Sequence, residues 1–261
     1  MKNTIDDLCK FREFLKSIPL NKYREELKNV KWVEQDLPKE ILPLSSVFKY
    51  YWEERKFLDF EKWFEDFWQE IHTNIKSREA LERFKRYYFN KKLDENDWFK
   101  KGFKARIYRT WISVLTQLDF CYLFEYMCAK ENRKLTLECN ADLDAKGIDA
   151  RVNNIEFQIA KISYRKEARS ASKKKNLITI PYPVFNIEDL QRLIKSPRVK
   201  EERKERYQRS LQAFRKYFIQ LENGFVVFHE NYLRCILDNI DNIEHLKRTV
   251  EQILSELLGE S

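Results

Sequence analysis

The feature that most constrains the fold is a change of hydrophobic period near residue 134. Before it, aromatic and aliphatic residues recur at helical spacing, most clearly in residues 58–75 and 103–130. After it, residues 134–139 and 155–162 alternate between apolar and polar side chains, which is typical of half-buried strands. The sequence therefore predicts an almost entirely helical first part followed by a sheet.

The remainder of the chain favours an α/β fold. Residues 134–162 predict three short strands in a meander that turns through Gly147. Further elements follow: a strand at 177–183, helices at about 186–195 and 198–221, a strand buried on both faces at 224–229, and a long helix over 231–258. We expect a single domain over residues 1–261, with a mainly helical subregion at 1–102 and a catalytic core at 103–261.

Composition excludes several classes of protein. The four glycines lie too far apart to build a phosphate-binding loop, so no nucleotide cofactor is expected. No run of 18 apolar residues and no signal-peptide core occurs, which predicts a cytoplasmic protein without a membrane partner. The five scattered cysteines and three isolated histidines disfavour a zinc site. A net charge of +8 makes a polyanion the first partner to test, although it also fits ordinary solubility.

Carboxylates gather beside Gly147, where the predicted strands begin: Asp142, Asp144 and Asp149. If the two strands on either side of residues 153–154 pair as a hairpin, Gln158 and Ala160 share a face with Asp149. A carboxylate on one strand followed by Asp, Glu or Gln and then Lys two positions later is the PD-(D/E)xK arrangement of metal-dependent nucleases. Mg²⁺ needs one or two carboxylates with other oxygen ligands, so Asp149, Asp144 and Gln158 are the candidate metal ligands.

The lysine of this arrangement is missing at its expected position. In such nucleases it would hold and help deprotonate the attacking water. Here position 160 is alanine, and the next residue is Lys161, which a regular strand would point away from Asp149. Either a bulge turns Lys161 toward the site, or the catalytic lysine is absent. We interpret Ala160 as a natural or introduced substitution that inactivates the enzyme; the alternative without chemistry is a hairpin turn capped by aspartates.

A basic run follows the candidate site directly. Six cations occur within residues 163–175: Arg165, Lys166, Arg169, Lys173, Lys174 and Lys175. Such a run can grip the phosphates of nucleic acid, and a solvated basic face is the alternative. A second basic run at 198–216 contains interspersed glutamates and favours a surface helix with ion pairs between successive turns.

Five stretches of the chain resemble the TaqI family of type II restriction endonucleases in order and approximate spacing: VEQDLPKE (33–40), GFKARIYRTWISVLTQ (102–117), DLDAKGIDA (142–150), FQIAKISYRKEAR (157–169) and NGFVVFHENYL (223–233). The resemblance implies a PD-(D/E)xK restriction-endonuclease-like core, a mixed central sheet flanked by helices, with a large helical N-terminal part. It also implies a Mg²⁺-dependent homodimer that cuts double-stranded DNA at the palindrome TCGA, after the T of each strand.

The same resemblance assigns positions. Asp144 and Asp149 match the two acidic residues of the family. Ala160 takes the place of the family's lysine, and Lys161 matches a second lysine beside it. An additional acid from the 103–130 helix stays open between Glu125 and Asp119, although either, and Asp119 in particular, fits an ordinary surface acid of the helix.

Two alternatives to an active restriction enzyme remain. A noncatalytic DNA-binding protein on a degenerate nuclease fold would naturally carry Ala160. An RNA-binding or CRISPR-associated nuclease domain is the third hypothesis, which digestion of duplex DNA against single-stranded RNA would distinguish.

Overall fold

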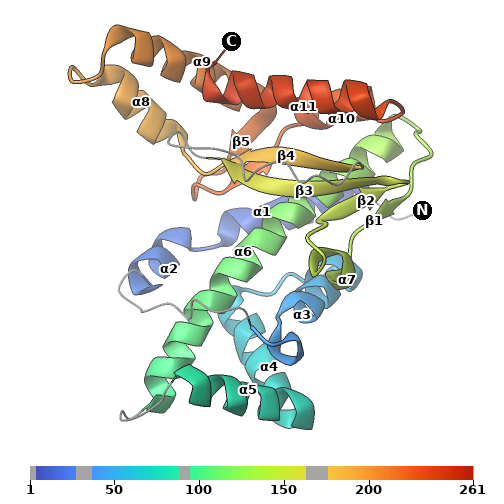
Figure 1. Cartoon of the computed structure of the whole chain (residues 1–261), viewed down its shortest axis with the longest axis vertical. Coiled ribbons are helices and arrows are strands. Elements are labelled where there is room, and N and C mark those ends of the chain that lie inside the picture. Colours follow the sequence, from blue (N-terminus) through green and yellow to red (C-terminus); the bar gives the residue numbers. More distant parts are fainter. Residues whose placement is uncertain (1–3, 28–36, 89–94, 163–175, 261) are drawn as a thin grey trace. The chain divides into compact units, whose positions relative to one another are not determined.

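The computed structural model describes residues 4–27, 37–88, 95–162 and 176–260. The chain forms two compact units (Figure 1): unit 1 comprises residues 1–16 and 119–261, and unit 2 comprises residues 17–118. The long helix α6 (Glu95–Lys130) contributes residues to both units. Each unit is compact by itself.

Unit 2 is helical throughout its described residues. It contains α2 (Leu20–Leu27), a 3₁₀ turn at Lys39–Ile41, α3 (Leu44–Phe48), a π-helical turn at Lys49–Glu53, α4 (Phe60–Thr73), α5 (Ile75–Tyr88) and the first part of α6. Asp59 caps α4 by accepting a hydrogen bond from the Lys62 amide. The aromatic stripe of α4 is buried, and Trp63 packs on Trp111 of α6 with ring centroids 6.4 Å apart. The helices predicted from these aromatic residues are thus confirmed as core elements.

Unit 1 is built around a four-stranded mixed sheet. Its strands are β1 (Leu137–Glu138), β2 (Ala150–Val152), β3 (Ile155–Ile162) and β4 (Leu177–Pro183), in the order β1-β2-β3-β4. The first three strands are antiparallel neighbours, and β4 runs parallel to β3. A two-residue turn joins β2 to β3, and Asn153 adopts a φ of 50° there, which Asn tolerates better than most residues. The predicted meander and the strand at 177–183 are therefore present.

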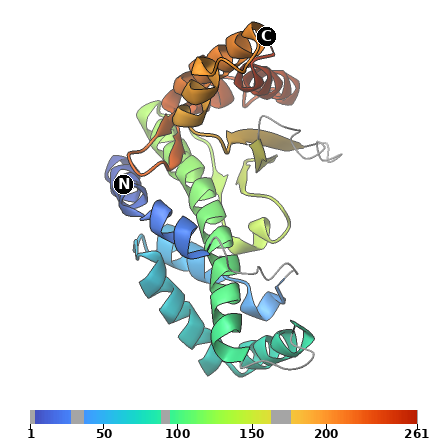
Figure 2. The ribbon, with the colours of Figure 1, turned by 90° about the vertical axis from the view of Figure 1, so that its left-hand side faces the viewer.

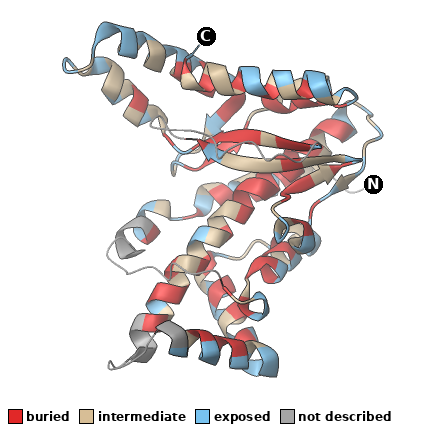
Figure 3. Cartoon of the chain, in the orientation of Figure 1, coloured by how far each residue is buried: buried red, intermediate tan, exposed pale blue. Residues whose placement is uncertain are grey.

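One face of this sheet is apolar and packs on the end of α6 that belongs to unit 1. Phe157 is fully buried and lies 5.8 Å, between ring centroids, from Phe120 of α6. Figure 2 shows the strands beside this part of α6, and Figure 3 shows that buried residues are concentrated along it. The opposite face of the sheet carries the polar residues of the candidate site.

The C-terminal part of unit 1 corrects two predictions. It contains α8 (Ile187–Lys195), α9 (Glu201–Tyr217), β5 (Phe218–Gln220), β6 (Val226–Phe228), α10 (Glu230–Leu237) and α11 (Ile243–Leu258). The helix predicted to reach residue 221 ends at Tyr217, because the next residues pair with β6 in a separate two-stranded sheet. The single helix predicted over 231–258 is broken, because the Asn242 side chain accepts hydrogen bonds from two amides and starts a new helix.

The position of Asp119 also differs from the prediction of a surface acid. Asp119 is fully buried on α6 and accepts a hydrogen bond from Arg12 Nε at 2.9 Å and one from the Phe228 amide at 2.7 Å. Arg12, on α1 (Thr4–Ser17), also donates to the Phe228 carbonyl. The acid therefore ties α1, α6 and β6 together, and sequence periodicity gave no sign of this because its partners lie more than 100 residues away along the chain.

The described residues thus form a mixed α/β structure whose four-stranded sheet is flanked by helices. This architecture is consistent with a restriction-endonuclease-like fold. Within the described ranges, every helix is too short or too polar to cross a bilayer.

Candidate active site

A short helix and a left-handed turn deliver the acidic residues to the sheet. Helix α7 (Ala141–Asp144) begins at Asn140, whose side chain accepts a hydrogen bond from the Leu143 amide at 3.0 Å. It closes at Gly147, which has a φ of 76°. The Gly147 amide donates to the Asp144 carbonyl, and the Ile148 amide donates to the Leu143 carbonyl. This pair of bonds is the Schellman motif, which needs a left-handed residue and explains the glycine at this position.

The β2–β3 hairpin places Asp149 against Phe157 and Ile159 of β3. Ala150 pairs with Phe157, and the Asp149 amide also donates to the Phe157 carbonyl at 2.8 Å, so residues 149 and 150 both lie against Phe157. Gln158 is the next residue of β3, and its side chain shares a face with Glu156 and Ala160. A methyl group at Gly147 would lie 3.8 Å from Gln158 Nε2, so the amide of Gln158 also lies beside the Gly147 turn.

Asp149 is the most strongly perturbed acid of the site. It is buried and accepts a hydrogen bond from the Ile159 amide at 2.5 Å. Burial raises the pKa of its carboxyl to about 7, the Ile159 amide opposes the rise, and the carboxylate of Asp144 adds to it. The charges of Asp144 and Asp149 therefore interact at a partly buried site, which is an arrangement that a cation would stabilise.

The structure separates Ala160 from Lys161. Strand β3 pairs with β4 in an unbroken parallel register from Glu156 to Ile162, so its side chains alternate without a bulge. Ala160 shares a face with Gln158 and is half-buried, whereas Lys161 belongs to the Phe157 face and is exposed. Strand β3 thus places no lysine on the Gln158 face.

The other predicted acids, Asp142, Glu125 and Asp119, differ in burial and in the residues they contact. Asp142 is exposed on α7. Glu125 is half-buried on α6, one helical turn beyond the buried Cys121. Burial raises the pKa of the Cys121 thiol, a hydrogen bond with Cys139 adds to this, and the charges of Glu125 and Asp149 make smaller contributions. Glu125 and Asp149 therefore both lie close to Cys121, whereas Asp119 is held by Arg12 and Phe228.

Strand β4 adds a polar residue that sequence reasoning missed. In the parallel register Gln158 pairs with Thr179, which is half-buried and shares the face of Gln158. Gln158 and Thr179 therefore lie side by side on neighbouring strands. The signal could not be seen in the sequence, because a parallel register is set by long-range packing rather than by a hairpin turn.

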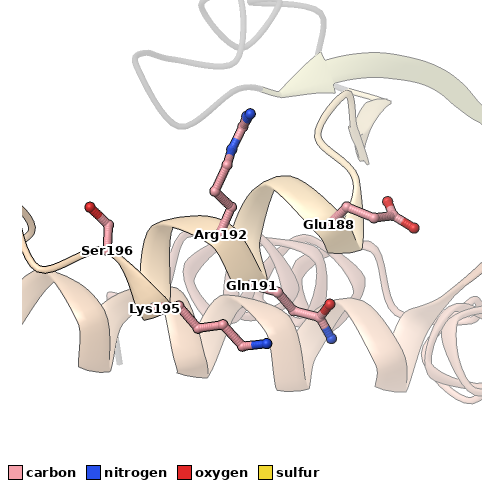
Figure 4. A pocket seen from close by; sticks show the side chains of 5 residues that line it. All are labelled: Glu188, Gln191, Arg192, Lys195 and Ser196. Atoms are coloured by element: carbon pink, nitrogen blue, oxygen red, sulfur yellow. The ribbon is translucent and has the colours of Figure 1, made fainter.

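The predicted phosphate-gripping cations lie outside the described residues: Arg165, Lys166, Arg169, Lys173, Lys174 and Lys175. Elsewhere in unit 1, an open groove of about 460 Å³ lies along α8, lined by Glu188, Gln191, Arg192, Lys195 and Ser196 (Figure 4). Arg192 points away from Gln191 and Lys195 and pairs with Asp189 at 2.5 Å. The groove contains none of the predicted site residues.

The oxygen ligands at Asp149 are suited to a hard cation. Among the described residues no cluster of three or more His, Cys, Asp and Glu side chains is arranged to hold a metal ion. Mg²⁺ does not require such a cage, because it is commonly held by one or two carboxylates and keeps several waters. Asp144 and Asp149, with the Gln158 amide beside the Gly147 turn that separates them in sequence, are the residues that could hold a divalent cation here.

The chain is similar to known restriction enzymes over most of its length. The model of the TaqI restriction endonuclease family matches residues 8–240. The type II restriction enzyme TaqI from Thermus aquaticus is 35% identical over 246 residues, which cover 87% of this chain and 85% of the relative. The type II restriction enzyme TthHB8I from Thermus thermophilus is 34% identical over 238 residues, 86% of this chain and 84% of the relative. No solved structure matches the chain significantly. The family match includes α7 and all four strands of the sheet.

Proposed function

From the premise that this chain belongs to the TaqI restriction endonuclease family, we propose that it binds double-stranded DNA at the palindrome TCGA and that Ala160 impairs its Mg²⁺-dependent cleavage. In kind it is a type II site-specific deoxyribonuclease, like the two named relatives. The TCGA specificity, with cleavage after the T of each strand, rests on the family resemblance.

The observation that carries this proposal is the position of Ala160. It follows Gln158 by two residues on the polar face of β3, beside the paired acids Asp144 and Asp149. A lysine at this point would extend from β3 directly after Ile159, whose amide donates to the Asp149 carboxylate. Lys161 points to the opposite face, so it cannot replace that lysine in a regular strand.

The chain's own residues have distinct roles in the proposed reaction. Asp149, Asp144 and Gln158 would hold Mg²⁺, which when bound supplies charge neutralisation on the phosphate and a more acidic water. The Ile159 amide orients the Asp149 carboxyl by donating to it. Because the pKa of Asp149 is about 7, a proton competes with the cation near neutral pH, and raising the pH favours the binding form of the site.

The partners follow from the same premise. A palindrome is read on both strands by a protein with matching two-fold symmetry, so we propose a homodimer. The six cations of residues 163–175, defined in the sequence analysis, are proposed to contact phosphates and to make binding depend steeply on salt. Action on DNA inside the cell would require a cytoplasmic location, which we propose for this protein.

The decisive experiment restores the lysine. Wild-type protein and Ala160→Lys are incubated with duplex DNA containing TCGA in Mg²⁺, and with a control duplex in which the palindrome is scrambled. We expect the lysine variant to cleave the TCGA duplex about 10²–10⁴-fold faster, the usual size of an acid–base contribution. Absence of any gain, with binding intact, contradicts the assignment of position 160.

The same variant tests the alternative of a noncatalytic DNA-binding protein. This alternative is favoured by the absence of a lysine on the face of β3 that carries Gln158 and Ala160. Such a protein would bind duplex DNA with a steep salt dependence and stay inactive as Ala160→Lys. A chain that shows no salt-dependent binding to duplex DNA at all contradicts both functions. The genomic codon at position 160 separates an introduced alanine from a natural one.

A further inference from the structure

Two neighbouring rows on the polar face of the sheet differ in how their side chains are satisfied. In one row, Arg151 donates to Glu138 and to Glu156, each at 3.1 Å, so three strands are bridged by ion pairs. The next row, two residues further along β3 and β4, contains Gln158 and Thr179. The charged groups of the first row are paired with one another, whereas the second row contains no such ion pair among the described residues.

The open row contains two polar groups that the described residues do not engage. Neither the Gln158 amide nor the Thr179 hydroxyl makes a hydrogen bond within the described part of the chain, and both residues are half-buried. Neither group is among the described buried polar atoms that lack a partner, so both are open to solvent on this face. A ligand that approaches the face can therefore accept a hydrogen bond from either group.

The position of Thr179 limits what that ligand can be. Parallel pairing places its Cβ next to that of Gln158, on the side of β3 opposite to Asp149. Whatever occupies the space over Gln158 thus meets the Thr179 hydroxyl on β4, and the Asp149 carboxylate lies at the amide of the next β3 residue, Ile159. Asp149 repels a second anion unless a cation lies between them, and a phosphodiester bridged by Mg²⁺ meets this condition.

We propose that Thr179 is a phosphate-binding residue, whose hydroxyl donates a hydrogen bond to a nonbridging oxygen of the DNA phosphodiester that lies over Gln158. This inference rests on the proposed function, because it assigns a further contact at the same site. Hydroxyl groups of Ser and Thr are common donors to DNA phosphates, and a donor to a charged acceptor binds more strongly than a donor to a neutral one. The contact orients the phosphate and carries no base specificity.

The test combines protein variants with altered DNA. Thr179→Val removes the hydroxyl and keeps the shape of the side chain, and Thr179→Ser keeps the hydroxyl. Thr249→Val, at a half-buried position of α11, is the matched control. Equilibrium dissociation constants are measured in Mg²⁺ for a TCGA duplex and for a series of duplexes that each carry one neutral methylphosphonate in place of a phosphate.

We expect Thr179→Val to bind the natural duplex about tenfold more weakly, while Thr179→Ser and Thr249→Val stay close to wild type. At one methylphosphonate position the wild type should lose affinity and Thr179→Val should lose no more, because both changes remove the same contact. Losses that add at every position, or wild-type affinity of Thr179→Val, overturn the inference and leave the proposed function standing. Failure of the wild type to bind duplex DNA overturns the proposed function itself.

Folding of the variants is checked by circular dichroism and thermal unfolding. Should Thr179→Val not fold, Thr179→Ala is measured against Thr179→Ser on the same duplexes. The expected loss and its non-additivity at one phosphate apply unchanged to that pair.

Discussion

Two aspartates are buried in unit 1, and they are treated in opposite ways. Asp119 meets the Arg12 guanidinium and the Phe228 amide, so its charge is neutralised by partners from two other elements. Asp149 accepts from the Ile159 amide but faces the carboxylate of Asp144, and its pKa rises to about 7. A buried acid with a cationic partner holds the fold together, whereas a buried acid whose pKa is raised beside another acid is typical of a functional site.

The largest effect on stability is expected at the paired acid. Asp119→Ala leaves Arg12 without its buried partner and should lower the free energy of unfolding by about 3–5 kcal/mol. Urea unfolding at pH 8 measures the loss, with Asp142→Ala as the exposed control, expected within about 0.5 kcal/mol of wild type. Equal stability of Asp119→Ala and Asp142→Ala would contradict the structural role of Asp119.

At Asp149, removal of the charge should change the free energy of unfolding in the opposite direction. Because the folded pKa of Asp149 is raised, its contribution to stability is fully present below pH 4 and is lost as the pH rises through 7. Asp149→Asn keeps an acceptor for the Ile159 amide without the buried charge. At pH 8 the free energy of unfolding of the variant should therefore exceed that of the wild type by on the order of 3 kcal/mol. At pH 4 the two proteins should be equally stable. A variant less stable than wild type at pH 8 would show that the carboxylate is satisfied by the fold.

Mg²⁺ should stabilise the protein through Asp149. A ligand of the folded state stabilises it by mass action, so Mg²⁺ at about ten times its dissociation constant should raise the free energy of unfolding of the wild type by about 1.4 kcal/mol at pH 8. The effect should vanish in Asp149→Asn and shrink at pH 5, where Asp149 is protonated. Thermal unfolding with Mg²⁺ and with matched ionic strength from NaCl measures it, and equal stabilisation of both proteins would place the cation elsewhere.

The smallest expected effect concerns the turn that joins Asp144 to Asp149. Gly147→Ala places a side chain at a φ of 76° and should cost about 1 kcal/mol, and Gly147→Asn should cost less because Asn tolerates this conformation. Chemical denaturation of both variants measures the difference. If alanine and asparagine are equivalent, the left-handed turn is not what holds the two acids together.

Local patterns in the sequence predicted much of the fold. The aromatic stripe over 58–75 predicted a helix, and α4 occupies Phe60–Thr73, because a period of 3.6 residues can only bury one face of a helix. Alternation predicted β3, and the hairpin of β2 with β3, which the sequence left as a condition, is present. By contrast, the break between α10 and α11 was missed, although residues 238–242 (DNIDN) are rich in Asp and Asn, which favour turns and helix caps.

By itself, the sequence determined the local elements, the acids around Gly147 and the absence of a lysine at position 160, because each of these depends on residues close together in the chain. Only the tertiary structure decided that Asp119 is a buried structural acid, that Lys161 lies on the far face of an unbroken strand, and that Thr179 completes a row with Gln158. These facts depend on strand register and on contacts between distant segments. Such contacts are set by packing, which no local pattern of residues encodes.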